Sequence, residues 1–103
     1  MRTHPKTSVA GFVSWVEKQP AKTKYLYLSP NDCPYARYLR TLGMKDFRVG
    51  GTEWCKVQGS KQGEIYTIPR RVSWALSNII RGNTYGALLE RLTASRQVVG
   101  VLA

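Results

Sequence analysis

Apolar residues recur with helical spacing in the first segment of the chain. Thr7 or Ser8 can cap this segment, and Gln19-Pro20 ends it. We therefore expect an amphipathic helix over about residues 8–18. Its apolar stripe consists of Val9, Phe12, Val13 and Val16.

A second stripe of the same period follows a turn. The helix is predicted over about residues 33–42, with Pro34 in its first turn and Gly43 as the left-handed residue after its end. The stripe consists of Tyr35, Tyr38, Leu39 and Leu42, with Ala36 beside it.

Other segments are rich in aromatic and β-branched residues, as strands are. Residues 24–28 are predicted as a strand, and residues 46–57 as extended chain that Gly50-Gly51 interrupts with a bulge or a tight turn. Residues 59–63 are predicted as a hairpin loop and residues 64–68 as its returning strand. These segments predict a three-stranded, mainly antiparallel sheet.

The second half of the chain predicts two more helices. Pro69 can open the first, and Thr84 can cap the last after a turn at Arg81-Gly82-Asn83. Their apolar faces are Val72, Leu76, Ile79 and Ile80 in the one, and Tyr85, Leu88, Leu89 and Leu92 in the other. The prediction is a single α+β domain over residues 1–103, with about four helices packed on the sheet. Residues 1–6 are expected to be flexible, and the apolar tail 96–103 to dock on the core or on a partner.

Composition limits the classes of protein to consider. A chain of 103 residues suffices for one domain, and a hydrophobic fraction of 43% suffices for a buried core. No apolar run could cross a bilayer, and the N-terminal segment lacks a signal-peptide core, so we expect a cytoplasmic protein without membrane partners. Cys33 and Cys55 are expected to be buried thiols, and with His4 as the one histidine we predict neither a zinc site nor a cofactor.

The charge is the unusual property. Sixteen Lys and Arg residues against six acidic residues give a net charge of +10, which attracts nucleic acids or acidic protein surfaces, although many small basic proteins bind no DNA. Arg70 and Arg71 open a predicted helix, where the helix dipole disfavours positive charge, so this doublet is the first candidate for contact with phosphate or carboxylate. Arg37 and Arg40, with Lys45 just beyond their helix, are the second candidate, and a solvated face is the alternative for each group. A sparser third group consists of Lys18, Lys22 and Lys24.

Candidate catalytic groups are few. Cys33 at a predicted helix N-terminus could act as a nucleophile, as in papain-like hydrolases, but its only possible base is His4 and the adjacent Asp32 opposes thiolate formation. A core or capping thiol is the favoured interpretation. The six acidic residues form no paired motif, and Gly50-Gly51 lacks the pattern of a phosphate-binding loop, so no residue is assigned a catalytic role.

Residues 70–93 read as helix, turn and helix, which is also the order of a DNA-reading motif. The last helix offers Glu90 and Arg91 as its charged groups and few side chains for base edges in its first turns. An αα-hairpin without sequence-specific readout is therefore favoured. Tyrosines on the strands could stack on bases, although core or sheet packing is the favoured use; these are Tyr25, Tyr27 and Tyr66.

Short motifs run through most of the chain in a characteristic order. They are Phe12-Val13-Ser14-Trp15, Gln19-Pro20, Asp32-Cys33-Pro34-Tyr35-Ala36-Arg37-Tyr38-Leu39, Val49-Gly50-Gly51, Ile68-Pro69 and Thr84-Tyr85-Gly86-Ala87-Leu88-Leu89-Glu90-Arg91-Leu92. In these motifs the chain resembles a family of small proteins of phage and prophage type, also encoded in proteobacterial genomes, which has no established activity. The resemblance implies a mobile-element context, in which small non-enzymatic proteins commonly inhibit host or defence machinery, as anti-CRISPR proteins do.

Small size, high positive charge and the lack of catalytic motifs favour a binding protein over an enzyme. The leading hypothesis is a non-enzymatic protein that occupies an acidic surface of a host nucleic-acid-handling or defence complex, with anti-CRISPR-like inhibition as one form. The alternative is sequence-independent binding of DNA or RNA, and a cysteine hydrolase that uses Cys33 comes third. The sequence leaves the oligomeric state open.

Overall fold

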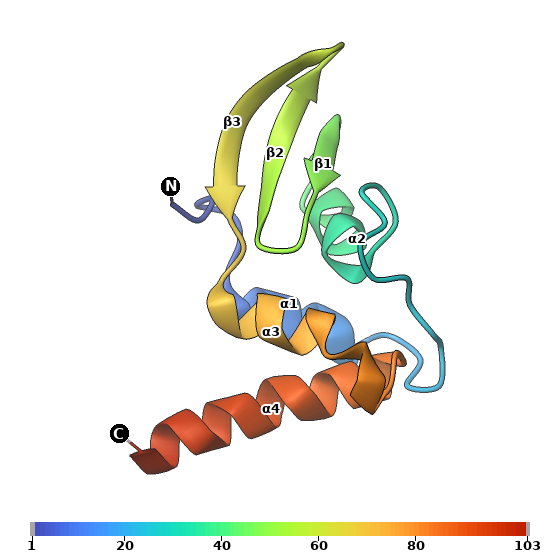
Figure 1. Ribbon diagram of the computed structural model, residues 1–103, viewed down its shortest axis with the longest axis vertical. Coiled ribbons are helices and arrows are strands. Elements are labelled where there is room, and N and C mark those ends of the chain that lie inside the picture. The colour runs from blue at the N-terminus through green and yellow to red at the C-terminus, as the bar shows by residue number, and fades with distance from the viewer. Residues whose placement is uncertain (1, 103) are drawn as a thin grey trace.

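The computed structural model describes residues 2–102, and for residues 95–102 only the helical backbone. In this part of the chain, four α-helices and a three-stranded antiparallel sheet confirm the α+β class (Figure 1). The elements are α1 (Val9–Glu17), α2 (Pro34–Thr41), β1 (Phe47–Val49), β2 (Glu53–Gln58), β3 (Lys61–Thr67), α3 (Arg70–Ser77), the 3-10 turn η1 (Ile79–Arg81) and α4 (Tyr85–Leu102). No helix among these residues is both long and apolar enough to span a bilayer.

Local signals in the sequence set the ends of three helices. The Ser8 hydroxyl accepts the Gly11 N–H at 2.9 Å, which caps α1 as predicted. Pro34 opens α2, and Gly43 follows its end with a φ of 86°, the left-handed conformation that glycine adopts without steric cost. The Thr84 hydroxyl accepts the Ala87 N–H at 3.2 Å and caps α4.

The sheet has the order β1-β2-β3, and both pairs of neighbours are antiparallel. Gly50-Gly51 belongs to the tight turn between β1 and β2, so the turn rather than the bulge is the correct alternative. The irregularity in the sheet lies between Cys55 and Val57 instead. The hairpin loop is shorter than predicted: Gln58 pairs with Lys61, and Gly59, with a φ of 64°, forms the two-residue connection with Ser60.

The predicted strand over residues 24–28 is wrong. This segment makes only an isolated bridge between Lys24 and Thr84, and Leu28 has a φ of 62° in a turn. The Tyr25 N–H donates to the Asn83 carbonyl at 2.7 Å, so the segment runs along the start of α4 rather than along the sheet. The three strands of the sheet therefore all come from residues 47–67.

Helices and sheet share one core. The buried face of the sheet presents Phe47, Val49, Trp54 and Tyr66, and its other face presents the cross-strand row Arg48, Cys55 and Ile65. α2 packs against β1, whereas α1 and α3 each pack against α4 (Figure 1). Aromatic rings join α1 to α2, with the centroid of Phe12 5.4 Å from the centroids of both Tyr35 and Tyr38.

Arg91 on α4 is buried, with 6% of its surface exposed. Its Nε donates to the Ala75 carbonyl, its Nη1 to the Gly82 carbonyl and its Nη2 to the Tyr25 hydroxyl, each at 2.8 Å. Tyr25 in turn donates its hydroxyl proton to the Leu76 carbonyl at 3.1 Å. One guanidinium group thus joins α3, the residue after η1 and the loop before α2.

The same hydrogen bonds explain why α3 is shorter than the predicted helix, which included Ile79 and Ile80. In a continued helix, the carbonyls of Ala75 and Leu76 would accept the N–H groups of residues 79 and 80. Arg91 and Tyr25 occupy these carbonyls instead, and the chain leaves the helix at Asn78. Ile79 and Ile80 consequently lie outside the core, 43% and 97% exposed.

The N-terminal segment contacts the sheet, and the C-terminal segment continues α4. Within residues 1–6, which we expected to be flexible, Arg2 makes a parallel bridge with Tyr66 of β3, and its carbonyl accepts the Thr67 N–H at 3.0 Å. The predicted docking of the apolar tail 96–103 lies outside the described side chains, although α4 continues through Leu102.

We expect Tyr25→Phe to lower the free energy of unfolding by about 2 kcal/mol, because it leaves an Arg91 N–H and the Leu76 carbonyl without partners in the core. Arg91→Met removes all three bonds and should cost about 3–5 kcal/mol. Urea unfolding measures both. Tyr27→Phe removes a half-buried hydroxyl and is the control, with an expected change below about 0.5 kcal/mol. Equal stability of Tyr25→Phe and Tyr27→Phe would contradict this role of Arg91.

Alkaline pH should destabilise the fold through Tyr35. Burial raises the pKa of this tyrosine from 10.0 to about 12, with the nearby Thr7 side chain opposing the shift. The folded state then holds the phenol proton more tightly than the unfolded state, so this stability is complete below pH 10 and is lost as the pH rises from 10 to 12. The loss amounts to about 2–3 kcal/mol. The urea midpoint of Tyr35→Phe should therefore fall less steeply between pH 10 and 12 than that of the wild type. Parallel profiles of midpoint against pH for the two proteins would refute this role of Tyr35.

Candidate functional site

Arg37 and Arg40, predicted as a contact group, lie exposed on α2 and share one carboxylate. Arg37 Nε lies 3.1 Å from Asp32 Oδ1 and its Nη2 lies 3.3 Å from Oδ2, while Arg40 Nη2 lies 3.5 Å from Oδ1. Arg40 also donates to the Asn31 carbonyl. The hydrogen bond from Arg37, together with the charges of both guanidinium groups, lowers the pKa of Asp32. Asp32 thus holds the two arginines side by side and cancels half of their charge.

Lys45 extends this group toward the sheet. A hollow between the end of α2 and β1 is lined by Arg40, Lys45 and Asp46, among others. A second hollow shares Lys45 and Asp46 with it and adds Lys56 of β2. Arg40 and Lys45 therefore lie together at the β1 edge, whereas Lys56 belongs to the central strand and shares the second hollow with Glu64. We call Arg40 and Lys45 the β1-edge cations.

Arg70 and Arg71 lie elsewhere. They begin α3, which continues directly from β3, whereas α2 lies beside β1 at the opposite edge of the sheet (Figure 1). Arg70 is exposed and Arg71 half-buried, and the first turn of α3 holds no acidic residue. The structure therefore does not bring the two predicted arginine groups together into one surface.

A mixed aromatic and charged cluster at the N-terminal end of the chain was not foreseen. The His4 ring lies 4.8 Å from that of Tyr66 and 5.6 Å from that of Trp54, measured between centroids. Tyr66 donates its hydroxyl proton to Glu64 at 2.6 Å, and Lys56 Nζ lies 6.0 Å from the Tyr66 ring. Partial burial lowers the pKa of His4, and the charges of Lys56 and Lys6 add to the effect, so the imidazole is neutral at pH 7. The alternation along β2 and β3 could have paired Trp54 with Tyr66, but nothing in the sequence placed His4 on them.

Cys33 lacks the surroundings of a nucleophile. It precedes α2 and is 4% exposed, and burial raises its pKa, although backbone N–H groups at the start of α2 oppose the shift. Cys55 is half-buried on the sheet and not buried as predicted. Among the residues that the structure describes, no three His, Cys, Asp or Glu side chains gather as metal ligands would.

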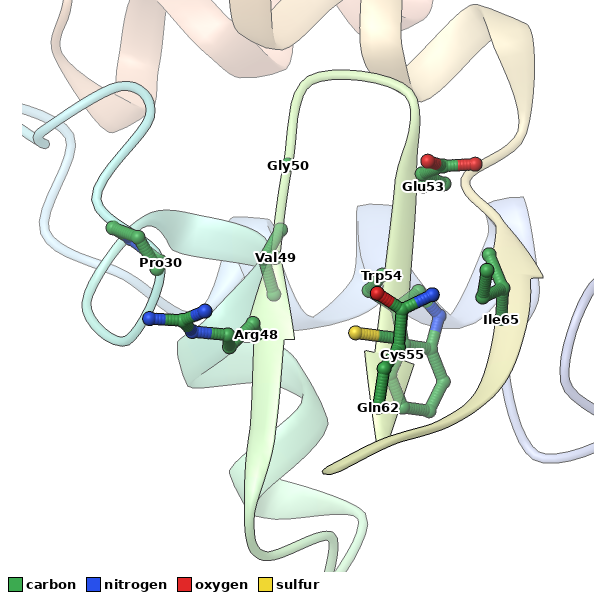
Figure 2. A pocket seen from close by; sticks show the side chains of 9 residues that line it. All are labelled: Pro30, Arg48, Val49, Gly50, Glu53, Trp54, Cys55, Gln62 and Ile65. Carbon is green, nitrogen blue, oxygen red and sulfur yellow. The ribbon is translucent and has the colours of Figure 1, made fainter. Parts of the chain in front are cut away.

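The open face of the sheet is slightly hollowed. The hollow, of about 260 Å³, is lined by Arg48, Cys55, Gln62, Glu53 and Ile65 among others, and the Arg48 side chain extends toward Pro30 (Figure 2). Arg48 and Glu53 are of opposite charge, and the hollow is shallow. The site offers a small surface of mixed polarity rather than an enclosed place for a substrate.

Several large apolar side chains are exposed. Leu26 is 63% exposed and Leu28 56%, on the loop that the sequence assigned to a strand. Ile79 and Ile80 are exposed on η1, and Trp74 is 44% exposed on α3. The pattern of apolar residues could not reveal the exposure of Ile79 and Ile80, because it depends on where α3 ends.

Comparison of the chain with protein-family models, with curated proteins and with solved structures gives no match. The function must therefore be argued from the residues and surfaces of this chain.

If Asp32 masks Arg37 and Arg40, Asp32→Asn should strengthen binding to a polyanion by more than its single charge explains. We expect Asp32→Asn to elute from a heparin column at higher salt than Glu17→Gln, which makes the same charge change on α1. Unfolding midpoints should change little, because the ion pairs are exposed. Identical elution of the two variants would show that Asp32 leaves the arginines available.

Proposed function

We propose that this chain is a non-enzymatic binding protein of phage or mobile-element type. It acts in the host cytoplasm and occupies an acidic surface of a nucleic-acid-handling or defence complex. Anti-CRISPR-like inhibition is one concrete form of this activity.

The observation that carries the proposal is the number of cations without a carboxylate partner. Among the described residues, only Arg37 and Arg40 form ion pairs, both with Asp32. Arg91 is buried on carbonyl and hydroxyl groups. Exposed or half-buried cations outside these interactions occur on every side of the sheet and on several helices: Arg2, Lys6, Lys18, Lys22, Lys24, Lys45, Arg48, Lys56, Lys61, Arg70, Arg71 and Arg81. Free surface charge of one sign favours fast association with partners of the opposite sign.

A protein partner is favoured over nucleic acid by the exposed aliphatic side chains. Leu26 and Ile80 add apolar contact area, which protein interfaces use at their centre. Phosphate contacts, by contrast, need cations and polar groups.

Sequence-independent binding of DNA or RNA is the second candidate. It is favoured by the β1-edge cations, which line two adjoining hollows and could follow a phosphate backbone. A cysteine hydrolase remains third, because burial raises the pKa of Cys33 and thereby disfavours the thiolate.

Two matched charge reversals test the proposal and locate the contact. Arg70→Glu with Arg71→Glu and Arg40→Glu with Lys45→Glu each change the net charge by the same amount, at opposite edges of the sheet. We expect one double variant to lose at least about tenfold in affinity for the partner captured from nuclease-treated host extract, and the other to lose less than about threefold. Equal small losses from both pairs would place the contact on neither predicted group.

Salt and nuclease separate the two candidates. If nucleic acid is the ligand, the wild-type protein shifts duplex or single-stranded probes at about 50 mM salt and loses orders of magnitude in affinity by about 200 mM. If an acidic protein is the ligand, the probes do not shift and capture survives nuclease treatment. Capture that disappears with nuclease would overturn the protein-partner proposal.

A further inference from the structure

The loop of residues 24–28 and the turn η1 expose aliphatic side chains close to each other in the fold. Leu26 follows Tyr25, whose N–H donates to the Asn83 carbonyl, and Lys24 bridges to Thr84. Ile80 lies in η1, three residues before Asn83, and is 97% exposed. The two segments are therefore fixed side by side, and each presents an aliphatic residue to solvent.

Both segments are held by the same buried guanidinium group. Arg91 donates to the Gly82 carbonyl, directly after η1, and to the Tyr25 hydroxyl, directly before Leu26. Leu28 is held at a φ of 62°, a conformation that leucine seldom adopts and that costs free energy. Exposed leucine and isoleucine on a fixed backbone lose little conformational freedom when a partner covers them, which favours binding.

The charged side chains nearest in sequence to Leu26 and Ile80 are all basic. Lys22, Lys24 and Arg81 are exposed next to them. Neither residues 18–31 nor residues 77–89 contain an aspartate or a glutamate. A surface that covers the aliphatic residues must therefore approach a local excess of positive charge.

We propose that this surface, the loop–η1 patch, docks a protein face in which carboxylates surround an apolar pocket. The patch consists of Lys22, Lys24, Leu26, Ile80 and Arg81. The inference rests on the proposed function and deepens it, because it adds an apolar centre to the contact from residues outside both predicted arginine groups. Leu26 and Ile80 fill the pocket, and the three cations pair with its carboxylate rim.

Other occupants fit the patch less well. Nucleic-acid bases stack on aromatic rings or guanidinium groups, and leucine and isoleucine offer neither. A second copy of the chain would bring equal positive charge onto the patch. A membrane surface is bound by helices with a broad apolar face, whereas these residues come from a loop and one 3-10 turn.

Site-specific photocrosslinking tests the inference directly. The photoreactive amino acid benzoylphenylalanine replaces Leu26 or Ile80 in the full chain expressed in its host, and replaces the exposed residues Ala10 on α1 or Thr41 on α2 as controls. We expect ultraviolet light to give a nuclease-resistant protein adduct at 26 and 80 and at least about tenfold less at 10 and 41. Mass spectrometry should identify a protein with an acidic surface.

Several results would overturn the inference. An adduct of twice the chain mass would assign the patch to a second copy, and a nuclease-sensitive adduct would assign it to nucleic acid. Binding to phosphatidylglycerol vesicles that Leu26→Ser with Ile80→Ser abolishes would assign it to a membrane. Adducts that form with the photoreactive residue at 45 or 70 but not at 26 and 80 would refute the patch and leave the proposed function standing. The lack of protein adducts at every position would refute both.

Substitutions provide an independent measurement. Leu26→Ser with Ile80→Ser leaves the charge unchanged and should weaken capture of the crosslinked protein at least about tenfold, because it removes two buried aliphatic contacts. Urea midpoints equal to wild type would show that both side chains are dispensable for folding. Ala10→Ser is the control for a change at an exposed position away from the patch. If Leu26→Ser with Ile80→Ser captures the protein as well as wild type does, and Lys22→Glu with Lys24→Glu captures less, the contact depends on charge alone. That result would refute the apolar pocket.

Discussion

The arrangement of the helical part of the molecule depends on one buried cation that has no carboxylate partner. Arg91 is neutralised by carbonyl and hydroxyl dipoles, and the Ala75 carbonyl lies near the C-terminal end of α3, where the helix dipole favours positive charge. The planar guanidinium group reaches three acceptors on three segments at once, a geometry that lysine cannot reproduce. The end of α3, the path of the loop before α2 and the position of η1 all follow from this single side chain.

Features that local chemistry determines could be predicted from the sequence. The Ser8 and Thr84 caps, Pro34 and Gly43 act within a few residues, so the ends of α1 and α2 and the start of α4 followed from spacing and residue type. The prediction of a strand around Tyr25 was wrong. The segment has the composition of a strand, but the side chain that Tyr25 binds, Arg91, lies 66 residues further along the chain. Arg91 itself was counted with the exposed charges, since nothing in the sequence distinguishes a buried arginine from a solvated one.

The net charge of the surface could be predicted from the sequence, but the positions of the charged groups on it could not. Arg37, Arg40 and Lys45 do share an edge, yet Asp32 offsets part of that charge through ion pairs that sequence spacing did not reveal. Arg70 and Arg71 lie across the sheet from them. Ile79 and Ile80 are exposed because α3 ends at Ser77, and Leu26 and Leu28 are exposed because their segment is a loop and not the predicted strand.

The parallel bridge between Arg2 and Tyr66 bears on the solubility of the chain. Unpaired strand edges are templates for aggregation, and a three-stranded sheet has two of them. The carbonyl of Arg2 takes up the Thr67 N–H of β3, and the carbonyl of Pro30 takes up the Val49 N–H of β1, so a peptide segment blocks part of each edge. Beyond the bridge, the exposed Lys61 adds charge to the remaining stretch of β3. The backbone at Arg2 thus covers the end of β3, and association through this edge would first have to displace it.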